Sequence, residues 1–167
     1  MTDLTIVGID PSLTATGVAF SERNGRAEVT LKTNLRGMAR LHYIATEVAA
    51  YTEGADLVAI EGYAYGRPNQ AAHLGELGGV IRLTLWRAGI RYVDVPPACV
   101  KKYATGRGNA TKPDVRMAVF KRYGHDIADD NQCDAFVLMA MALHASGHPL
   151  EQVPALNRSA LDKFEWA

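Results

Sequence analysis

The sequence has little cysteine, no long apolar run and no net charge, and the first two of these absences exclude whole classes of protein. Its 167 residues contain two cysteines, Cys99 and Cys133, outside any CxxC or Cys/His spacing, which argues against a disulfide framework and a zinc site. We expect both to be small buried residues. No apolar run reaches the roughly 18 residues that span a bilayer, and no basic segment followed by an apolar one indicates a signal peptide. The prediction is a cytoplasmic protein without membrane contact.

The formal net charge is zero, from 18 basic and 18 acidic residues, and by itself it does not suggest a nucleic-acid partner. The charges are nevertheless distributed unevenly. From Arg82 to Arg122 the chain carries ten basic and two acidic residues, a local charge of +8, so the remainder carries −8. This asymmetry is typical of a protein that tracks a polyanion on one surface while carboxylates elsewhere hold cations. The alternative is that these basic residues are ordinary solvated charges on helix surfaces.

Length and composition predict one domain with a full hydrophobic core, since the chain is 48% hydrophobic and close to the usual size of a single domain. We place this domain at residues 1–147. Residues 148–167 contain two prolines and no clear apolar periodicity. They are expected to form a C-terminal extension or a partner-binding arm.

Hydrophobic periodicity predicts an α/β fold with a mixed five-stranded sheet flanked by helices. The Asn-Gly signal in "RNG" joins the second and third strands as a hairpin. The predicted strands cover residues 4–9, the two arms of 16–33, 56–62 and 91–97, and the predicted helices cover 38–54, 70–88, 97–106, 114–123 and 129–147. The first three strands would be antiparallel. The first and fourth would be parallel neighbours, joined by a right-handed crossover.

Asp10 is unusual because it follows the apolar run "TIVGI" directly. A lone buried carboxylate is costly unless a cation or hydrogen bonds compensate its charge. One interpretation places Asp10 just past the strand, in a turn formed by "DPS" with its proline. The other is that the strand holds Asp10 as a metal ligand or general base, which requires further carboxylates nearby.

Further acids occur at the ends of other apolar segments. Glu61 follows "LVAI", so it would lie at the same sheet edge as Asp10 if the two strands are parallel neighbours. Asp130 and Asp134 are four residues apart and share one face of the last predicted helix, with Asn131 beside them. Taken singly, Glu61 could be a strand-end cap and Asp130 a charge that complements the helix dipole. Together they predict a site for Mg²⁺ or Mn²⁺, because all the donors are oxygen atoms.

Four segments resemble, in order and spacing, the blocks that are typical of RuvC-like Holliday-junction resolvases, within the RNase H-like superfamily. They are "VGIDPSLTATGVAF", "VAIEGYAYGRPNQAAHLGELGGVI", "PPACVKKYATGRGNATKPDV" and "DDNQCDAFVLMAMALH", which together span roughly residues 4–146. The resemblance implies an RNase H-like fold and a nuclease that cuts Holliday junctions by two-metal-ion hydrolysis. Other branched DNA is a further candidate substrate. It implies two Mg²⁺ ions per site, for which Mn²⁺ can substitute.

The resemblance assigns three metal-binding acids to Asp10, Glu61 and Asp134. The family's fourth ligand, Asp or His, precedes the last acid by three residues, and here that position is Asn131. An amide oxygen can bind Mg²⁺ but adds no negative charge. We therefore expect Asp130, the neighbouring residue, to serve as the fourth catalytic acid.

The resemblance also assigns DNA contacts to the basic region. Lys101 and Lys112 match family lysines that approach the scissile phosphate, and Lys102 and Arg107 would add contacts to the DNA backbone. For Lys112 the alternative is a solvated residue near a helix start, where a cation opposes the helix dipole.

Two tyrosines, Tyr63 and Tyr65, follow Glu61 in a predicted loop where the family often carries an aromatic residue that stacks on a base at the branch point. A role in the core is the alternative for either ring. Two symmetric cuts need two active sites, so the resemblance implies a homodimer. The face "HLGELGGVIR" of helix 70–88 is its expected interface, unless its small residues serve packing within the chain.

Two other classes of function remain open. The segment "GIDPSLTATG" resembles the phosphate-binding hairpin of actin-like ATPases and sugar kinases, although those proteins need two such domains. A branched-DNA-binding protein without cleavage is the second alternative, because Asn131 replaces a charged ligand. ATP hydrolysis without DNA would favour the first class, and junction binding without a divalent-dependent product would favour the second.

Overall fold

A mixed six-stranded sheet in the order β3-β2-β1-β4-β5-β6 runs through the molecule. The computed structural model describes residues 4–22, 25–63 and 68–166. The strands are β1 (Ile6–Asp10), β2 (Ala15–Glu22), β3 (Gly25–Lys32), β4 (Leu57–Glu61), β5 (Tyr92–Val95) and β6 (Glu165–Trp166). The helices are α1 (Gly37–Thr52), α2 (Pro68–Arg87), α3 (Pro97–Thr105), α4 (Lys112–Tyr123), α5 (Asp130–Ala145), α6 (Ala155–Arg158) and the 3₁₀-helix η1 (Ser159–Lys163).

The pairing of the five main strands confirms the predicted topology. Strands β1, β2 and β3 are successive antiparallel neighbours, whereas β1 pairs with β4, and β4 with β5, in parallel. The predicted hairpin signal covers residues 23–25, of which 23 and 24 lie outside the described residues, and Gly25 begins β3 and pairs with Glu22. The sixth strand, β6, is an addition that the sequence did not indicate, and it pairs antiparallel with β5.

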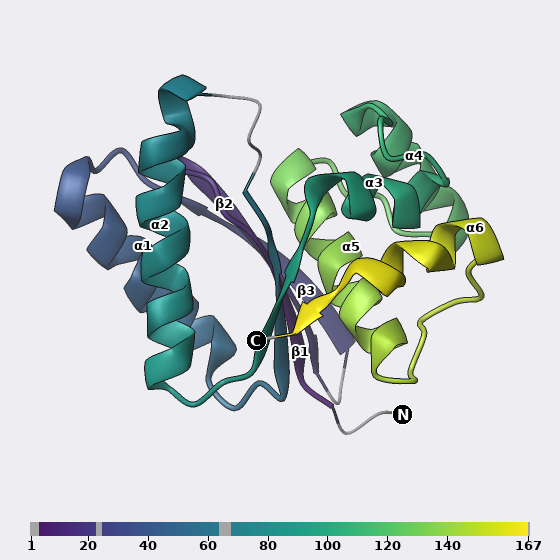
Figure 1. Cartoon of the computed structure of the whole chain (residues 1–167), viewed down its shortest axis with the longest axis horizontal. Coiled ribbons are helices and arrows are strands. Elements are labelled where there is room, and N and C mark those ends of the chain that lie inside the picture. The colour runs from purple at the N-terminus through teal and green to yellow at the C-terminus, as the bar shows by residue number, and fades with distance from the viewer. Residues whose placement is uncertain (1–3, 23–24, 64–67, 167) are drawn as a thin grey trace.

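Helices cover both faces of the sheet, as Figure 1 shows edge-on: α1 and α2 lie on one face, and α3, α4, α5 and α6 lie on the other. Each face has its own hydrophobic core. Val7 and Ile9 of β1 pack into the core beneath α1 and α2. Ile6 of the same strand packs into the core beneath α5. This alternation follows the period of two of a β-strand, and it sends Gly8 and Asp10 to the α5 face.

Two glycines allow α5 to lie directly on the sheet. A Cβ atom added to Gly8 would overlap the backbone of Ala135, and one added to Gly17 would overlap the backbone of Asn131. From Ala135 to Leu143 every residue of α5 is buried, because α5 packs on the sheet beneath a layer formed by α3 and α4. The glycines therefore fix the height of α5 above β1 and β2.

The C-terminal segment packs on the chain's own core rather than projecting as an arm. Ala160 and Asn157 are buried, and β6 extends the sheet. The short elements of this segment contact α3 and β5, and these contacts stabilise them in the absence of a clear local periodicity. The two cysteines are buried, as predicted. In the described part of the chain, no helix combines the length and apolar character needed to cross a membrane.

Candidate active site

Asp10 and Glu61 lie side by side at the C-terminal ends of two central strands, which we call the sheet edge. They are the last residues of β1 and β4, and the parallel register pairs Ile9 with Ile60 immediately before them. Leu57 and Ala59 of β4 pack into the core beneath α5, so the alternation of the strand sends Glu61 to the same face as Asp10. Asp10 is 6% exposed, and its carboxyl shares a hydrogen bond with that of Glu61.

Helix α5 brings Asp134 to this pair from above the sheet. Its first turn begins at Asp130, and Asp129 caps it by accepting hydrogen bonds from the backbone N–H groups of Asn131 and Gln132 at 2.9 and 3.2 Å. Asp129 is thus the N-cap of α5, and Asp130 is the acidic residue in its first turn. Asp134 is one turn further on, within electrostatic range of both Asp10 and Glu61.

Burial and mutual repulsion disfavour negative charge on these acids. Burial, then Glu61 and then Asp134, raise the pKa of Asp10 well above its usual value. Burial also raises the pKa of Glu61, although the hydrogen bond from Asp10 lowers it. Burial, followed by the charge of Glu61, raises the pKa of Asp134 to about 7. Lys112 lowers the pKa of all three acids, and Lys101 lowers those of Glu61 and Asp134.

This donor set has the chemistry of a site for a hard divalent cation. Its donors are carboxylate oxygens, which Mg²⁺ and Mn²⁺ prefer, and a cation among them would relieve the repulsion that raises their pKa values. Among the described residues, no three His, Cys, Asp or Glu side chains stand close enough together to enclose an ion.

Lys112 forms an ion pair with Asp130, the fourth candidate acid. Its Nζ lies 3.8 Å from Oδ2 of Asp130. Lys112 is the first residue of α4, which starts there because Thr111 and Asp114 form a capping box, two residues earlier than periodicity predicted. Asn131 lies beside Asp130, and its backbone carbonyl rests over Gly17. The structure thus places both candidates for the fourth ligand at the N-terminus of α5.

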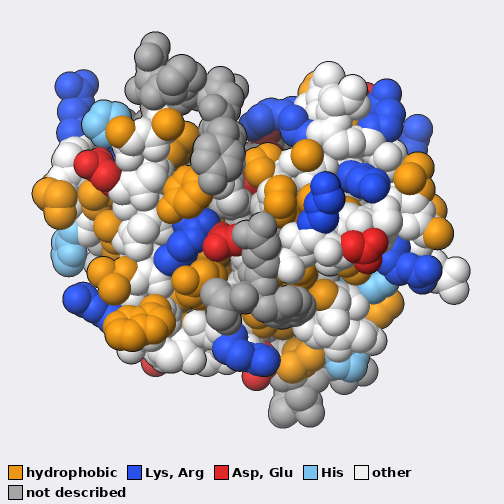
Figure 2. All heavy atoms as spheres, in the orientation of Figure 1, with side chains coloured by type: hydrophobic (Ala, Val, Ile, Leu, Met, Phe, Trp, Pro, Cys, Tyr) orange, Lys and Arg blue, Asp and Glu red, His pale blue; other side chains and the backbone are white. Residues whose placement is uncertain are grey.

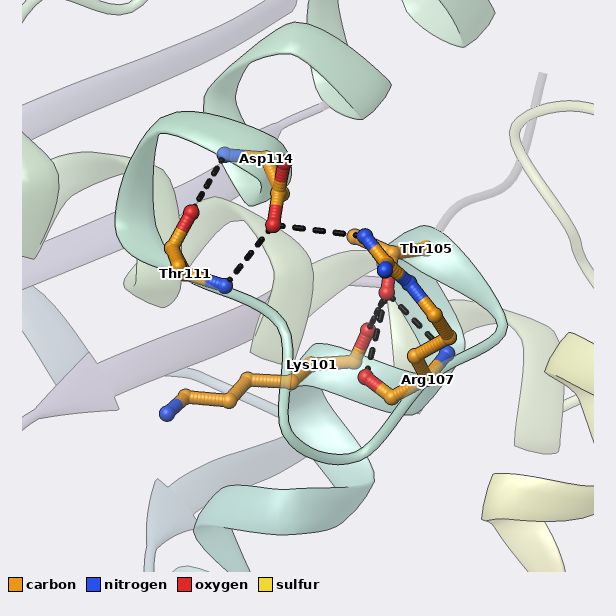
Figure 3. Close-up of polar contacts among 5 residues, drawn as sticks. All are labelled: Lys101, Thr105, Arg107, Thr111 and Asp114. Atoms are coloured by element: carbon orange, nitrogen blue, oxygen red, sulfur yellow. Dashed lines mark hydrogen bonds and ion pairs between the residues drawn. The ribbon is translucent and has the colours of Figure 1, made fainter.

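A network of hydrogen bonds shapes the loop between Lys101 and Lys112 (Figure 3). Arg107 donates to Oδ2 of Asp114 at 3.3 Å, and the Thr105 hydroxyl donates to the carbonyl oxygens of Lys101 and Arg107. The Lys101 side chain extends away from this network in Figure 3. Asp114 therefore restrains Arg107, whereas the charge of Lys101 acts on Glu61 and Asp134.

Some of the basic side chains lie over the layer that contains α3 and α4 (Figure 2). Figure 2 shows lysine and arginine side chains on the right-hand side, over the region where Figure 1 places α3 and α4. Lys102 is half-buried on α3, next in sequence to Lys101. The predicted basic residues thus lie on α3, on α4 and on the loop between them, and two of them, Lys101 and Lys112, act on the acidic cluster.

Tyr63 is half-exposed beside Glu61, and Tyr65 lies outside the described residues. Sequence reasoning missed two residues that contact this region: Arg82 of α2 donates to the Tyr63 hydroxyl at 3.3 Å and is itself bound by Asp94 of β5. The one sequence signal for these contacts is that Arg82 lies within an otherwise apolar helix face, which indicates that it has a polar partner. Its partners are 19 and 12 residues away in sequence, so no local pattern identifies them.

A family model and individual relatives that match this chain carry the same description. Residues 6–144 match the family model described as crossover junction endodeoxyribonuclease RuvC. The protein of that name from Rhodopirellula baltica is 34% identical over 164 residues, covering 89% of this chain and 88% of its own. The one from Chlamydia muridarum is 30% identical over 159 residues, covering 86% and 93%.

Solved structures share the fold. The chain described as T. thermophilus RuvC in complex with Holliday junction substrate matches with a TM-score of 0.70 at 19% identity, covering 90% of this chain and 99% of that one. The chain described as the Thermus thermophilus RuvC structure matches with a TM-score of 0.67 at 21% identity, covering 90% and 100%. The likeness thus extends over nearly the whole length of both solved chains.

Proposed function

This chain belongs to the RuvC family of crossover junction endodeoxyribonucleases, and from that premise we propose that it cuts Holliday junctions by hydrolysing phosphodiester bonds. The observation that carries the proposal is the cluster of Asp10, Glu61 and Asp134 at the sheet edge, faced by Lys101 and Lys112. Carboxylates that hold cations, next to lysines that neutralise phosphate, are what phosphodiester hydrolysis requires.

Each group of this cluster has a distinct task in the reaction. Lys101 and Lys112 attract the scissile phosphate to the sheet edge and offset part of its charge. The strands hold Asp10 and Glu61 in fixed positions, so their oxygens orient whatever binds between them. Burial of the pair keeps bulk water from competing with these contacts.

We propose that the site uses Mg²⁺, or Mn²⁺ in its place, with two ions held by Asp10, Glu61, Asp134 and a fourth ligand. When bound, such ions lower the pKa of water and stabilise negative charge on the phosphate and the leaving oxygen. We assign the fourth position to Asp130 rather than Asn131, because two adjacent dications need carboxylate charge to offset their repulsion. The ion pair between Asp130 and Lys112 supports this assignment. Lys112 also acts on Asp10, Glu61 and Asp134, so the pair places Asp130 beside the same three acids.

The substrate of this site is branched DNA, primarily the four-way junction, with three-way and flap structures as further candidates. Lys101, Lys112, Lys102 and Arg107 would contact the DNA backbone, and Tyr63 would stack on a base at the branch point. We further propose that the chain acts as a homodimer in the cytoplasm, because two symmetric strands must be cut. The exposed side chains of Leu83 and Trp86 on α2 support an interface on that helix.

The deciding experiment incubates the protein with labelled four-way, three-way, flap and linear DNA, each with and without Mg²⁺ or Mn²⁺. We expect divalent-dependent cutting of the four-way junction in preference to linear DNA. Binding of junctions without any cut product would instead favour a junction-binding protein, the class to which the neutral Asn131 points. ATP hydrolysis without DNA would favour the ATPase class, which the family match does not support.

A further inference from the structure

Tyr63 is held in place by Arg82, a residue of α2. The guanidinium carbon of Arg82 lies 4.7 Å from the centre of the Tyr63 ring, and its Nη1 donates to the tyrosine hydroxyl at 3.3 Å. A cation against the ring and a hydrogen bond at its tip restrain both the tilt and the reach of the side chain. Tyr63 nevertheless remains 39% exposed, so part of its ring is available to a ligand.

Arg82 is itself fixed by Asp94 of β5. Its Nε donates to both carboxylate oxygens of Asp94, at 3.0 and 3.2 Å, and its Nη2 donates to Oδ1. The Arg82 side chain is 14% exposed. A planar guanidinium bound in this way has its remaining donor, Nη1, directed to one place. Asp94 therefore determines where Arg82 holds Tyr63.

Gly78 provides the space in which the two side chains meet. A Cβ atom added there would lie 2.6 Å from Nη1 of Arg82 and 2.9 Å from both Cε1 and the hydroxyl of Tyr63. The ring and the guanidinium therefore rest against the bare backbone of α2. A side chain at this position would displace one or both of them.

These contacts lie beside the catalytic acids. A small cavity of about 60 Å³ is lined by Pro11, Glu61, Gly62, Tyr63, Leu74, Gly78 and Arg82. The backbone N–H of Gly62 donates to the carbonyl of Val95 at 2.8 Å, which ties the link between Glu61 and Tyr63 to the same strand that carries Asp94. The ring is thus fixed relative to the acids through β5 and α2.

We infer that Arg82, held by Asp94, is a positioning residue that presents the Tyr63 ring as a platform for an unstacked base at the branch point. The inference rests on the proposed function, in which Tyr63 stacks on a base, and adds the residues that hold the ring ready for that contact. A base leaves its stack readily only at a branch or end, and a fixed aromatic ring receives it without the entropy cost of ordering a flexible side chain.

The test uses four-way junctions with 2-aminopurine at the branch point, bound in EDTA so that no cutting occurs. Stacking on Tyr63 should quench the fluorescence of the probe with the parent protein, and Tyr63→Ala should abolish that quenching. Arg82→Ala and Arg82→Lys should each lose most of it, because neither keeps the bidentate contact with Asp94. We expect junction affinity to fall by roughly fivefold or more for each variant.

A double-mutant cycle separates positioning from general stability. If Arg82 acts through Tyr63, adding Arg82→Ala to Tyr63→Ala should cause no further loss of affinity or quenching. Arg91→Ala, an exposed arginine at the opposite end of β5, is the matched control and should quench like the parent. Thermal melting of each variant shows whether it is folded. If Arg82→Ala is unfolded, Arg82→Lys tests the positioning role in its place.

Undiminished quenching by folded Arg82 variants, or additive losses in the cycle, would overturn the positioning role alone. Undiminished quenching by Tyr63→Ala would also overturn it. Failure of the parent protein to bind or cut junctions would instead overturn the proposed function, so the two failures are distinguishable.

Discussion

At the scale of single residues, Asp10 lies at the centre of the proposed site, and its buried negative charge lowers the stability of the folded protein. Asp10→Asn should lower junction cutting by roughly a hundredfold or more, because it removes a charged ligand. It should also raise the melting temperature, since a buried carboxyl whose pKa is raised by burial and by Glu61 no longer has to be accommodated. Cleavage assays and thermal melting measure the two effects. Junction binding in EDTA should be unchanged, and retained cutting would show that the site is misassigned.

The fourth ligand is tested by three substitutions at two neighbouring positions. Asp130→Asn should reduce cutting by roughly tenfold or more, Asn131→Ala should act more mildly, and Asn131→Asp should be neutral or beneficial, because only carboxylates offset the repulsion between two dications. The Mg²⁺ and Mn²⁺ dependence of cutting is the measurement. Normal cutting by Asp130→Asn together with an inactive Asn131→Ala would assign the amide as the ligand.

The lysines beside the acids are expected to contribute to binding through phosphate contacts. Lys101→Ala and Lys112→Ala should each weaken junction binding and reduce the slope of log affinity against log salt by about 1. The fold should be unaffected, since both side chains are at least partly exposed. Fluorescence anisotropy over a series of salt concentrations measures the slope. Arg91→Ala controls for general charge, and an unchanged slope in both lysine variants would place the DNA elsewhere.

The sequence predicted the acids better than the residues that support them. Asp10 and Glu61 are conspicuous because each ends an apolar strand, and the period of two then determines that they share a face. The contacts of Arg82 with Asp94 and with Tyr63 could not be predicted. They depend on how far α2 sits from β5, which is a property of packing and has no local signature in sequence.

At the scale of elements, the position of α3 depends on the C-terminal segment. The amide of Asn157, which is buried, donates to the carbonyls of Tyr103 and Ala104 at 2.9 and 3.3 Å, and Arg122 also donates to the carbonyl of Tyr103. These bonds satisfy carbonyls in the last turn of the helix that carries Lys101.

Asn157→Ala should therefore destabilise the protein by about 1–3 kcal/mol, because the carbonyl of Ala104 loses the Asn157 donor and that of Tyr103 keeps only Arg122. Urea denaturation followed by circular dichroism measures the change. Ser159→Ala, which removes an exposed hydroxyl on the same segment, should change stability by less than about 0.5 kcal/mol. Equal stability of the two variants would show that the segment does not brace α3.

The same comparison explains which elements were predictable. Helices α1 and α5 and the five main strands have periodic apolar patterns that specify them locally. The elements α6, η1 and β6 are short, and their stability comes from contacts with α3 and β5, so periodicity could not reveal them. Helix α4 lies between these cases, because the spacing of Thr111 and Asp114 is a readable start signal that the prediction passed over.

At the scale of the whole molecule, the two layers of helices differ in surface character. Basic and hydrophobic side chains are visible over both layers (Figure 2), but α3 and α4 carry Lys101, Lys102 and Lys112, whereas α2 carries two large exposed hydrophobic side chains. On α2, Trp86 is 71% exposed and Leu83 is 45% exposed. Large exposed apolar side chains on one helix indicate a contact surface, and a two-fold axis there would place two active sites on one junction.

Trp86→Glu should therefore weaken the proposed homodimer by roughly thirtyfold or more, since a charge would be buried where the proposal packs an aromatic anchor. Sedimentation over a range of concentrations measures the assembly, and the cleavage products report its consequence. A monomer should leave four-way junctions nicked on one strand, whereas the dimer cuts both. Leu156→Glu changes a similarly exposed apolar residue on the other layer and should leave the mass of the assembly unchanged. A parent protein that sediments as a monomer, or a Trp86→Glu variant that still dimerises and makes paired cuts, would move the interface away from α2.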